Sequence, residues 1–498
     1  MTEGGPVRST PRSPGWPGPC TLDPSTRVLD HGRVVIGGSP LRILRLTDRG
    51  AHLVAALTGD AGEPSDLRPA TEAALLRRLL DAGIINPHPF LPHTVDRPEV
   101  TVVVPAHDDA AALGRTLAAL DRESSSISEI LVVDDGSDDP HAIESAVQRC
   151  VSTAANADRT TRLIRREVNG GPAAARNAGL AQVRTALVAF VDAGCEPDAG
   201  WLEPLVAHFG DPDLALVAPR IVATPDAARA PGAIARYEAA RSPLDLGPDA
   251  GPIRARSRIS YVPAATMLVR TEAAAATGFD ETLRVGEDVD FVWRVGPARY
   301  DPAATVGHDH RTSVGPWLRR RFEYGTSAAP LARRHEGAVT PVGMSGWSAA
   351  AWALVAAGRP ATALAVAAAT TALVPGKLRA LPDPGREALR LGARGHLAAG
   401  SALARALSRE WWPVAAALAL TSRRARQAVV AAAVAPALAD WWQQGRATGL
   451  DPLRFVALHL ADDVAYGTGV WAGCLRERTG APLTPDLRSW PGRSTPPS

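Results

Sequence analysis

The sequence predicts an α/β protein whose central domain, residues 98–335, folds as a doubly wound sheet. Two observations support this prediction. Short β-branched runs that suit buried parallel strands alternate with Ala- and Leu-rich runs of helical spacing. The composition also changes twice, because a small unit precedes this domain and an Ala-, Leu- and Trp-rich region follows it. Such a sheet binds its ligand outside the carboxyl ends of its strands.

Composition limits the class of protein. A chain of 498 residues predicts two or three domains. The net charge of +2, with 21% charged residues, excludes a broad basic surface for nucleic acid. The cysteines are far apart and form no CxxC pair, which argues against a zinc site and against a disulfide framework; they are Cys20, Cys150, Cys195 and Cys474. We therefore expect a cytoplasmic protein that binds no nucleic acid.

The N-terminal part divides into a tail and a small unit. Residues 1–24 are rich in Pro, Gly, Ser and Arg and lack the apolar core of a signal peptide, so we expect a disordered tail. Residues 25–90 predict a winged-helix-like unit, with a hairpin around Asp30–Gly32, a third strand at Leu44–Leu46 and two helices after it. This layout resembles the PqqD-like elements that recognise precursor peptides. A purely structural cap is the alternative.

The central domain contains strand-like runs with helical runs between them. The strand-like runs are Val100–Val104, Ile130–Val133, Arg162–Ile164 and Leu187–Val191. Polar motifs follow three of these strands, at Pro105–Asp108, Asp134–Ser137 and Asp192–Cys195. A single Asp after a strand commonly caps a helix or closes a turn. Because the carboxyl ends of parallel strands meet at one edge, three such motifs together indicate a ligand site.

Residues 99–325 resemble the glycosyltransferases of family 2, which have the GT-A nucleotide-sugar-binding fold. The matching motifs are Val102–Ala106, Val133–Ser137 (VDDGS), Asn169–Gly179 (NGGPAAARNAG) and Gly286–Asp290, which contains a Glu-Asp pair. The resemblance implies an inverting hexosyltransferase that uses a nucleotide-sugar donor. It also implies that six residues bind this donor: Pro105, Asp134, Asp135, Gly171, Arg176 and Asp192.

Each residue type suits its implied role. The Asp134 carboxylate can accept a hydrogen bond from an amide N–H such as that of uracil. Gly171 allows the backbone to approach the donor closely. Arg176 can neutralise donor charge or hold the Asp cluster. Asp192 would bind a divalent cation, Mg²⁺ or Mn²⁺, that bridges the diphosphate.

The metal motif departs from the family pattern. The family has Asp-x-Asp, whereas this chain has Asp192-Ala-Gly194, without the second carboxylate. His308 is our first candidate for the missing ligand, and other nearby side chains are His310, Glu196 and Asp198. Magnesium tolerates few protein ligands when phosphate and water complete its shell. The alternative is a binding protein that has lost catalysis.

The Glu-Asp pair supplies the candidate catalytic residues, Asp288 and Glu287. We expect Asp288 to be the general base, because a sugar hydroxyl needs a carboxylate to take its proton as it attacks. Attack from the opposite face of the ring inverts the anomeric centre. In the alternative interpretation, the two carboxylates only complement the dipole of the helix that they begin.

Two features further along the chain have more than one interpretation. The basic segment Trp317–Gly325 could hold the diphosphate, contact an anionic membrane surface, or form a solvated helix face. Region 340–480 is Ala-rich, and uncharged runs occur at 339–358, 361–376 and 411–422. The first run is long enough to span a bilayer. A membrane-associated region, at the inner face of the cell membrane, and a soluble helical bundle both remain open.

The whole layout, including Tyr324–His335 (YGTSAAPLARRH), resembles the mycofactocin biosynthesis glycosyltransferases of actinobacteria. This resemblance implies that the acceptor is a modified-peptide precursor of a redox cofactor. It also implies UDP-glucose as the donor and a β-linked glucose chain as the product. The second enzymatic interpretation is a glycosyltransferase for cell-wall or exported glycan, acting on a lipid or polysaccharide acceptor.

Overall fold

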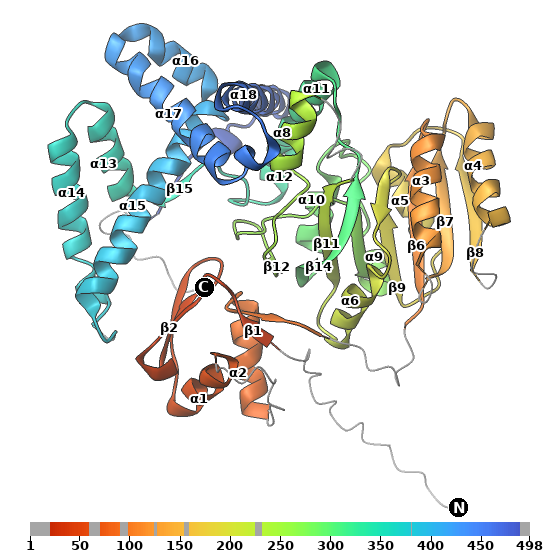
Figure 1. The fold of residues 1–498 in the computed structure, drawn as a ribbon, viewed down its shortest axis with the longest axis horizontal. Coiled ribbons are helices and arrows are strands. Elements are labelled where there is room, and N and C mark those ends of the chain that lie inside the picture. The colour runs from red at the N-terminus through yellow and green to blue at the C-terminus, as the bar shows by residue number, and fades with distance from the viewer. Residues whose placement is uncertain are drawn as a thin grey trace, which may run out of the picture.

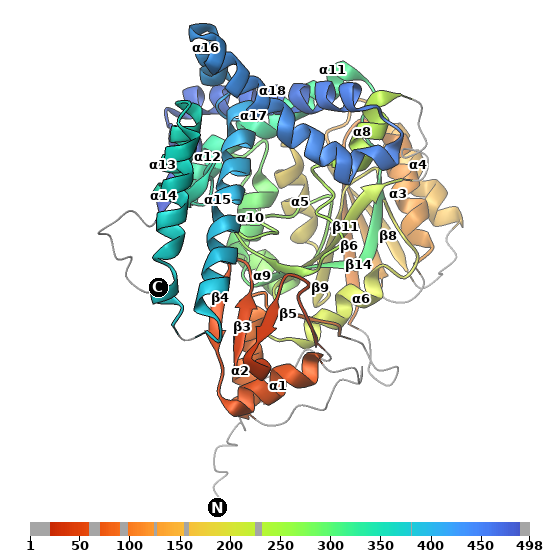
Figure 2. The same cartoon turned by 60° about the vertical axis from the view of Figure 1, so that its left-hand side comes forward.

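The computed structural model has three parts: a small N-terminal unit, a central sheet with helices on both faces, and a C-terminal group of helices (Figures 1 and 2). The structure describes residues 20–58, 70–89, 98–123, 127–153, 159–224, 232–379 and 381–488. Most of the predicted N-terminal tail, residues 1–19, lies outside this range.

The N-terminal unit contains a three-stranded antiparallel sheet followed by two helices. Strands β2 (Arg27–Leu29), β3 (Val34–Gly37) and β4 (Arg42–Arg45) pair in that order. Helices α1 (Asp48–Thr58) and α2 (Ala70–Asp81) follow. A buried apolar cluster joins the sheet to both helices and includes Val35, Leu53, Val54, Leu76, Leu79 and Leu80.

The unit begins earlier than we expect from the sequence. Cys20–Leu22 form β1, which pairs antiparallel with β5 (Ile85–Pro87). Asp23 is buried and accepts hydrogen bonds from the Ser25 backbone N–H at 3.0 Å and from Asn86 Nδ2 at 3.2 Å. It also forms an ion pair, at 2.8 Å, with Arg258, which is far away in the sequence. Assigning residues 20–24 to a disordered tail is therefore wrong, because strand pairing and a buried carboxylate hold them.

Ion pairs attach the N-terminal unit to the rest of the chain. The buried Asp211 carboxylate accepts from Arg77 on α2 and from Arg299 in the central domain, each at 2.7 Å. Arg27 on β2 makes a bidentate pair with Glu387 of the C-terminal region, at 2.6 and 2.8 Å. The N-terminal unit therefore contacts both other parts.

The central sheet has the strand order β10-β14-β11-β13-β9-β6-β7-β8, and β12 also pairs with β14. The half of the sheet at the β8 end is parallel, as predicted, and consists of β9 (Leu187–Val191), β6 (Val100–Ala106), β7 (Ile127–Asp135) and β8 (Thr160–Arg166). The half at the β10 end contains β10 (Cys195–Pro197), β11 (Leu216–Ala223), β12 (Gly251–Ile253), β13 (Thr266–Arg270) and β14 (Ala298–His308).

The half at the β10 end contains both parallel and antiparallel pairs, so the sheet as a whole is not the parallel sheet that the sequence predicts. Strand β13 runs antiparallel to both β9 and β11. The Asp192 backbone N–H donates to the Ala265 carbonyl at 2.9 Å, so β13 begins at the edge where β9 ends. This reversal brings the segment before β13 to the carboxyl edge of the parallel strands.

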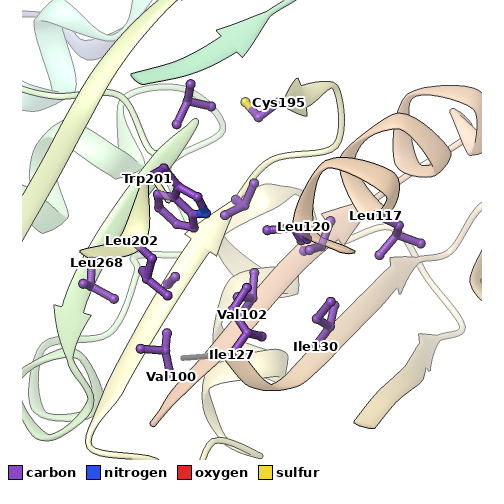
Figure 3. Close-up of a cluster of buried hydrophobic side chains, with 14 of the residues drawn as sticks. Val100, Val102, Leu117, Leu120, Ile127, Ile130, Cys195, Trp201, Leu202 and Leu268 are labelled. Carbon is purple, nitrogen blue, oxygen red and sulfur yellow. The ribbon is translucent and has the colours of Figure 1, made fainter. Parts of the chain in front are cut away.

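Helices cover both faces of the sheet, which explains the continuous β-branched runs. One face packs on α3 (Ala110–Asp121), α4 (Pro140–Thr153) and α6 (Leu202–Ala207). The other packs on α5 (Pro172–Leu180), α9 (Thr271–Thr277) and α10 (Glu287–Arg294). On β6, Val102 belongs to the first cluster, shown in Figure 3 with Leu117 and Leu120 of α3, whereas Val103 belongs to the second.

The C-terminal region is helical. Helix α8 (Ala233–Arg241) precedes this region in the sequence and packs against it, because Tyr237 lies in one buried cluster with Trp317 and Phe455. The region contains α11 (Val314–Thr326), α12 (Ala328–Arg334), α13 (Gly346–Ala356), α14 (Pro360–Ala372), α15 (Pro384–Ser408), α16 (Trp412–Thr421), α17 (Arg423–Gln443) and α18 (Pro452–Glu477). Short strands β15 (Gly343–Ser345) and β16 (Asp486–Arg488) pair in parallel. The uncharged run 339–358, all of which the structure describes, contains one helix, the 11-residue α13, after the short strand β15. Among the described residues, no helix combines the length and apolar character that crossing a bilayer requires.

Helices α11 and α18 touch through their backbones. A Cβ atom added to Gly325 on α11 would lie 2.0 Å from the Tyr466 carbonyl oxygen, and one added to Gly469 on α18 would lie 2.0 Å from the Phe322 carbonyl oxygen. Glycine at these positions allows the close approach. This contact fixes the C-terminal helices against the segment that leaves the central sheet.

We predict that Gly325→Ala lowers the free energy of unfolding by about 1–3 kcal/mol, because the added methyl group overpacks a backbone contact. Gly315→Ala on the same helix is the matched control, since a Cβ atom there meets nothing within 4 Å. We expect the control to be neutral or stabilising, by up to about 1 kcal/mol. Chemical denaturation of both variants measures the difference. Equal stability of the two would contradict the packing described here.

Candidate active site

The three polar motifs meet at one edge of the sheet. Strand β6 lies between β7 and β9, all three parallel, so their carboxyl ends are adjacent. Ala106 at the end of β6 is paired in register with Asp134 at the end of β7. Figure 1 shows this edge facing the C-terminal helices. The structure thus brings together motifs that are far apart in the sequence.

Asp134 is a buried carboxylate with one free oxygen. Its side chain is 1% exposed, and Oδ1 accepts from the Ser137 backbone N–H at 3.0 Å. Within the described part of the chain, Oδ2 has no hydrogen-bond partner, and Arg165 Nη1 lies 3.8 Å away from it. Buried carboxylate oxygens normally accept hydrogen bonds. Asp134 and the partly exposed Pro105 on the neighbouring strand could therefore contact a ligand N–H group.

Asp135 and Gly171 shape the loop that precedes α5. The Asp135 carboxylate accepts from the backbone N–H groups of Gly170 at 3.1 Å and Gly171 at 2.7 Å, and it pairs with Arg166. Gly171 has φ +90°, a conformation that side-chain-bearing residues rarely adopt. Both residues thus hold the start of α5, whose first residue is Pro172.

Arg176 on α5 holds two carboxylates together. Its side chain is 3% exposed and donates to Asp192 Oδ1 at 2.7 Å and to Glu287 Oε1 at 3.0 Å. Burial alone would lower the pKa of Arg176, but these two carboxylates raise it above its usual value. The sequence left open whether Arg176 neutralises donor charge or holds the Asp cluster; in the structure its guanidinium is paired with Asp192 and Glu287.

The Glu-Asp pair begins α10 at the same place. Asp288 accepts from the backbone N–H groups of Ala264 at 3.1 Å and Val289 at 2.8 Å, and its side chain remains partly exposed. Glu287 is buried. Burial and the neighbouring Asp288 charge raise the pKa of Glu287 to about 7, an effect that Arg176 partly offsets. Burial also raises the pKa of Asp288.

The backbone explains the glycine in the metal motif. The Cys195 N–H donates to the Asp192 carbonyl at 3.0 Å, which closes a turn, and Gly194 in this turn has φ +95°. Type II turns require glycine or asparagine at such a position. Gly194 therefore serves the turn that presents Asp192.

His308 is the second candidate ligand beside Asp192. It lies at the end of β14, in register with Cys195, and the attraction of Asp192 acts on its ring. Burial lowers the pKa of His308, which favours the neutral imidazole, and its Nδ1 has no hydrogen-bond partner within the described ranges. A neutral imidazole with a free nitrogen can bind a metal.

Two of the three other candidate side chains near the metal motif have partners elsewhere, whereas Nε2 of the third, His310, has no hydrogen-bond partner among the described residues. Glu196 pairs with Arg115 at 3.4 Å, and Asp198 accepts from the Thr305 hydroxyl. In the part of the chain that the structure describes, no three or more His, Cys, Asp or Glu side chains gather as a metal site. Asp192 and His308 could thus hold a cation only if phosphate oxygens and water completed its shell.

A cavity of about 1330 Å³ joins the sheet edge to the C-terminal helices. At the sheet edge it is lined by Arg176, Asp192, Glu287, Asp288 and His308. On the opposite side it is lined by Arg409, Glu410, Asp440 and Tyr466. Pro105, Asp134, Asp135 and Gly171 are not among its lining residues. The predicted site residues therefore form two neighbouring groups, one at the cavity and one at the ends of β6 and β7.

The basic segment on α11 has three different environments. Arg319 is 82% exposed and pairs with Glu323 at 3.1 Å. Arg320 lines the cavity and lies 4.9 Å from the centre of the Tyr324 ring. Arg321 is buried and pairs with Glu238 and Asp462. Arg320 and Arg321 both line the cavity, whereas Arg319 does not.

The sequence did not point to Arg409, Glu410 or Tyr466 as site residues. They come from the Ala-rich region, more than 100 residues after the Glu-Asp pair, and they match no motif. One signal was available, because Arg409-Glu410 is a charged pair directly before the uncharged run 411–422.

The chain was compared with known proteins. A family model described as "Glycosyl transferase family 2" matches residues 101–250. The pre-mycofactocin glycosyltransferase of Mycobacterium tuberculosis (strain H37Rv) is 38% identical over 481 residues, which cover 94% of this chain and 97% of that protein. Polypeptide N-acetylgalactosaminyltransferase 6 of Mus musculus is 33% identical over 128 residues, or 25% of this chain and 20% of that protein.

A solved structure of a mannosyltransferase from Pyrobaculum calidifontis, in complex with GDP-Man and Mn²⁺, is 20% identical. Its TM-score is 0.36, and the match covers 66% of this chain and 91% of that one. The identity to the mycobacterial enzyme extends over almost the whole of both chains. The family 2 match covers the strands that end at the candidate site. This chain is a glycosyltransferase of family 2 with the GT-A fold, and it belongs to the pre-mycofactocin glycosyltransferase family.

Proposed function

We propose that this protein transfers glucose from UDP-glucose, with inversion, to a peptide-derived mycofactocin precursor and builds a β-linked product. The observation that carries the proposal is the Glu287-Asp288 pair at the edge of a large cavity, in a chain that matches a pre-mycofactocin glycosyltransferase over 94% of its length. The name of that relative suggests the acceptor.

The sugar donor would lie along the carboxyl ends of β6, β7 and β9. Asp134 Oδ2 lacks a hydrogen-bond partner among the described residues and would accept from the base of the nucleotide. The diphosphate would reach Asp192 at the cavity. Arg176 is already paired with Asp192 and Glu287, so its contribution is to keep both carboxylates in place.

Asp288 is the residue best placed to take the proton of the acceptor hydroxyl. It lines the cavity, is partly exposed, and is held by two backbone N–H groups. Backbone donors fix the carboxylate in one orientation and leave its remaining lone pairs for the acceptor. Glu287 is less suitable, because it is buried and bound to Arg176.

We propose that Asp192 and His308 hold a divalent cation, Mg²⁺ or Mn²⁺, with the remaining ligands from the diphosphate and water. Nδ1 of His308 has no hydrogen-bond partner among the described residues, and burial lowers the pKa of the His308 ring. Both observations fit this role. A bound cation would stabilise the negative charge of the departing nucleotide.

We further propose that residues 25–90 recognise the peptide-derived acceptor. A three-stranded sheet followed by two helices supports this, as does the attachment of the unit to both other parts of the chain. Deleting the unit is a poor test, because it would leave Asp211 without its Arg77 partner. Its role stays a prediction.

Asp288→Asn should lower the rate of glucose transfer to pre-mycofactocin by roughly 100-fold or more, because the amide cannot accept the proton. UDP binding, measured by calorimetry, should be unchanged. Asp213→Asn, at a side chain that is 67% exposed, is the control and should behave as the wild type. Transfer at the wild-type rate by Asp288→Asn would show that another group is the base.

The pH profile of transfer provides a second prediction. A carboxyl group with a raised pKa becomes charged only at a higher pH, so the raised pKa of Asp288 should place the acidic limb of kcat at a higher pH than an ordinary aspartate does. An ordinary aspartate would place it near pH 4. Initial transfer rates measured from pH 5 to 9 distinguish these two outcomes, and thermal unfolding over the same pH range checks that the protein stays folded. An acidic limb near pH 4 would contradict the electrostatics of the site.

The cation can be tested by removal. Transfer should stop in EDTA, return with Mg²⁺ or Mn²⁺, and be lost in Asp192→Ala. Gly194→Asp restores the family pattern but introduces a side chain at φ +95°, so we expect lower thermal stability and no tighter cation binding. Transfer that is indifferent to EDTA and to Asp192→Ala would exclude the metal from the reaction.

A further inference from the structure

The cavity extends well beyond the sheet edge. Its volume of about 1330 Å³ exceeds the roughly 300–1,000 Å³ of typical ligand pockets. Tyr261 lines the cavity together with Asp288, Arg409 and Tyr466, and its hydroxyl donates to the Pro243 carbonyl at 3.2 Å. The candidate base and the C-terminal helices therefore face the same space, and a ligand at Asp288 can reach both.

Glu410 is a carboxyl group at the cavity whose contacts are a hydrogen bond from its own backbone N–H and one long ion pair. It lies between α15 and α16, lines the cavity, and has a side chain that is 16% exposed. Its partner Arg409 Nε is 3.5 Å away, longer than the roughly 2.7–2.9 Å of a charge-assisted hydrogen bond. Burial raises the pKa of Glu410 to about 7. Since buried polar groups normally have close partners, this side chain has room for one from a ligand.

Arg409 and Tyr466 form a stacked pair beside Glu410. The centre of the Arg409 guanidinium lies 3.7 Å from the centre of the Tyr466 ring. Its Nη1 is 3.5 Å from Asp463 Oδ1, again a long contact. Stacking on the ring holds the guanidinium in one plane. Its N–H groups and the Glu410 oxygens thus offer donors and acceptors side by side.

This combination suits a polyhydroxylated ring. Hydroxyl groups both donate and accept, so they can bind a guanidinium and a carboxyl group at once. The C–H face of such a ring can pack on an aromatic side chain, as apolar surface does elsewhere. The charged nucleotide, in contrast, has its candidate contacts at Asp192, on the sheet side of the cavity, and at Asp134, which lies outside the cavity lining.

We propose that Arg409, Glu410 and Tyr466 form an acceptor subsite, which binds a hydroxylated ring of the acceptor across the cavity from the sugar donor. This inference rests on the proposed function. It makes the C-terminal helical region part of the active site, and the glycine contacts between α11 and α18 fix its position.

The test uses the full-length protein with UDP-glucose and pre-mycofactocin. Glu410→Ala should raise the KM for pre-mycofactocin by roughly 10-fold or more, the effect of losing a hydrogen bond to a charged group. Hydrolysis of UDP-glucose without acceptor should stay within about 2-fold of wild type, because the donor side is untouched. The matched control is Glu477→Ala on α18, whose carboxylate pairs with Arg333 at 3.2 Å and does not line the cavity.

Tyr466→Leu is the second variant and removes the aromatic face, with thermal unfolding as the check on folding. A raised KM in both variants, with unchanged hydrolysis, supports the subsite. An unchanged KM in a folded variant, or an equal loss of hydrolysis and transfer, would overturn it while the proposed function stands. A wild-type protein that turns over no nucleotide sugar would overturn both.

Discussion

The buried Arg176 guanidinium is the interaction on which the site depends. It lies between Asp192, at the end of β9, and Glu287, at the start of α10, so one side chain joins three elements of the central domain. Removing a charge from water is costly, and a buried cation persists only when carboxylates surround it. The same contacts place Asp288 at the cavity, because it follows Glu287 in the first turn of α10.

The cavity is a joint product of the sheet and the C-terminal helices. The antiparallel entry of β13 brings Ala264 to Asp288, where its N–H orients the carboxylate. The close contact of α11 with α18 then places Tyr466 opposite. Neither part forms the space alone. The family model matches residues 101–250, which include Arg176 and Asp192 on the sheet side but none of the C-terminal helices.

Local patterns predicted the central domain well. Strand β6 alternates Val102 and Val103 between two cores, which is the burial that a continuous β-branched run indicates. The edge formed by Asp134 and Asp192 followed from parallel pairing alone. The reversal of β13 was not predictable, because direction depends on which neighbour a strand joins. Glu410 was missed for a similar reason, since only tertiary packing brings an Ala-rich region to the site.

The most direct test of this account is the rate of glucose transfer from UDP-glucose to pre-mycofactocin by Arg176→Gln, compared with wild type. Glutamine is shorter than arginine and carries no charge, so it would not bridge Asp192 and Glu287, which would then repel each other and any bound diphosphate. We predict a loss of roughly 100-fold or more, comparable with the removal of other preorganised charge-stabilising groups. Transfer at the wild-type rate by a folded Arg176→Gln variant would contradict the central role of this residue.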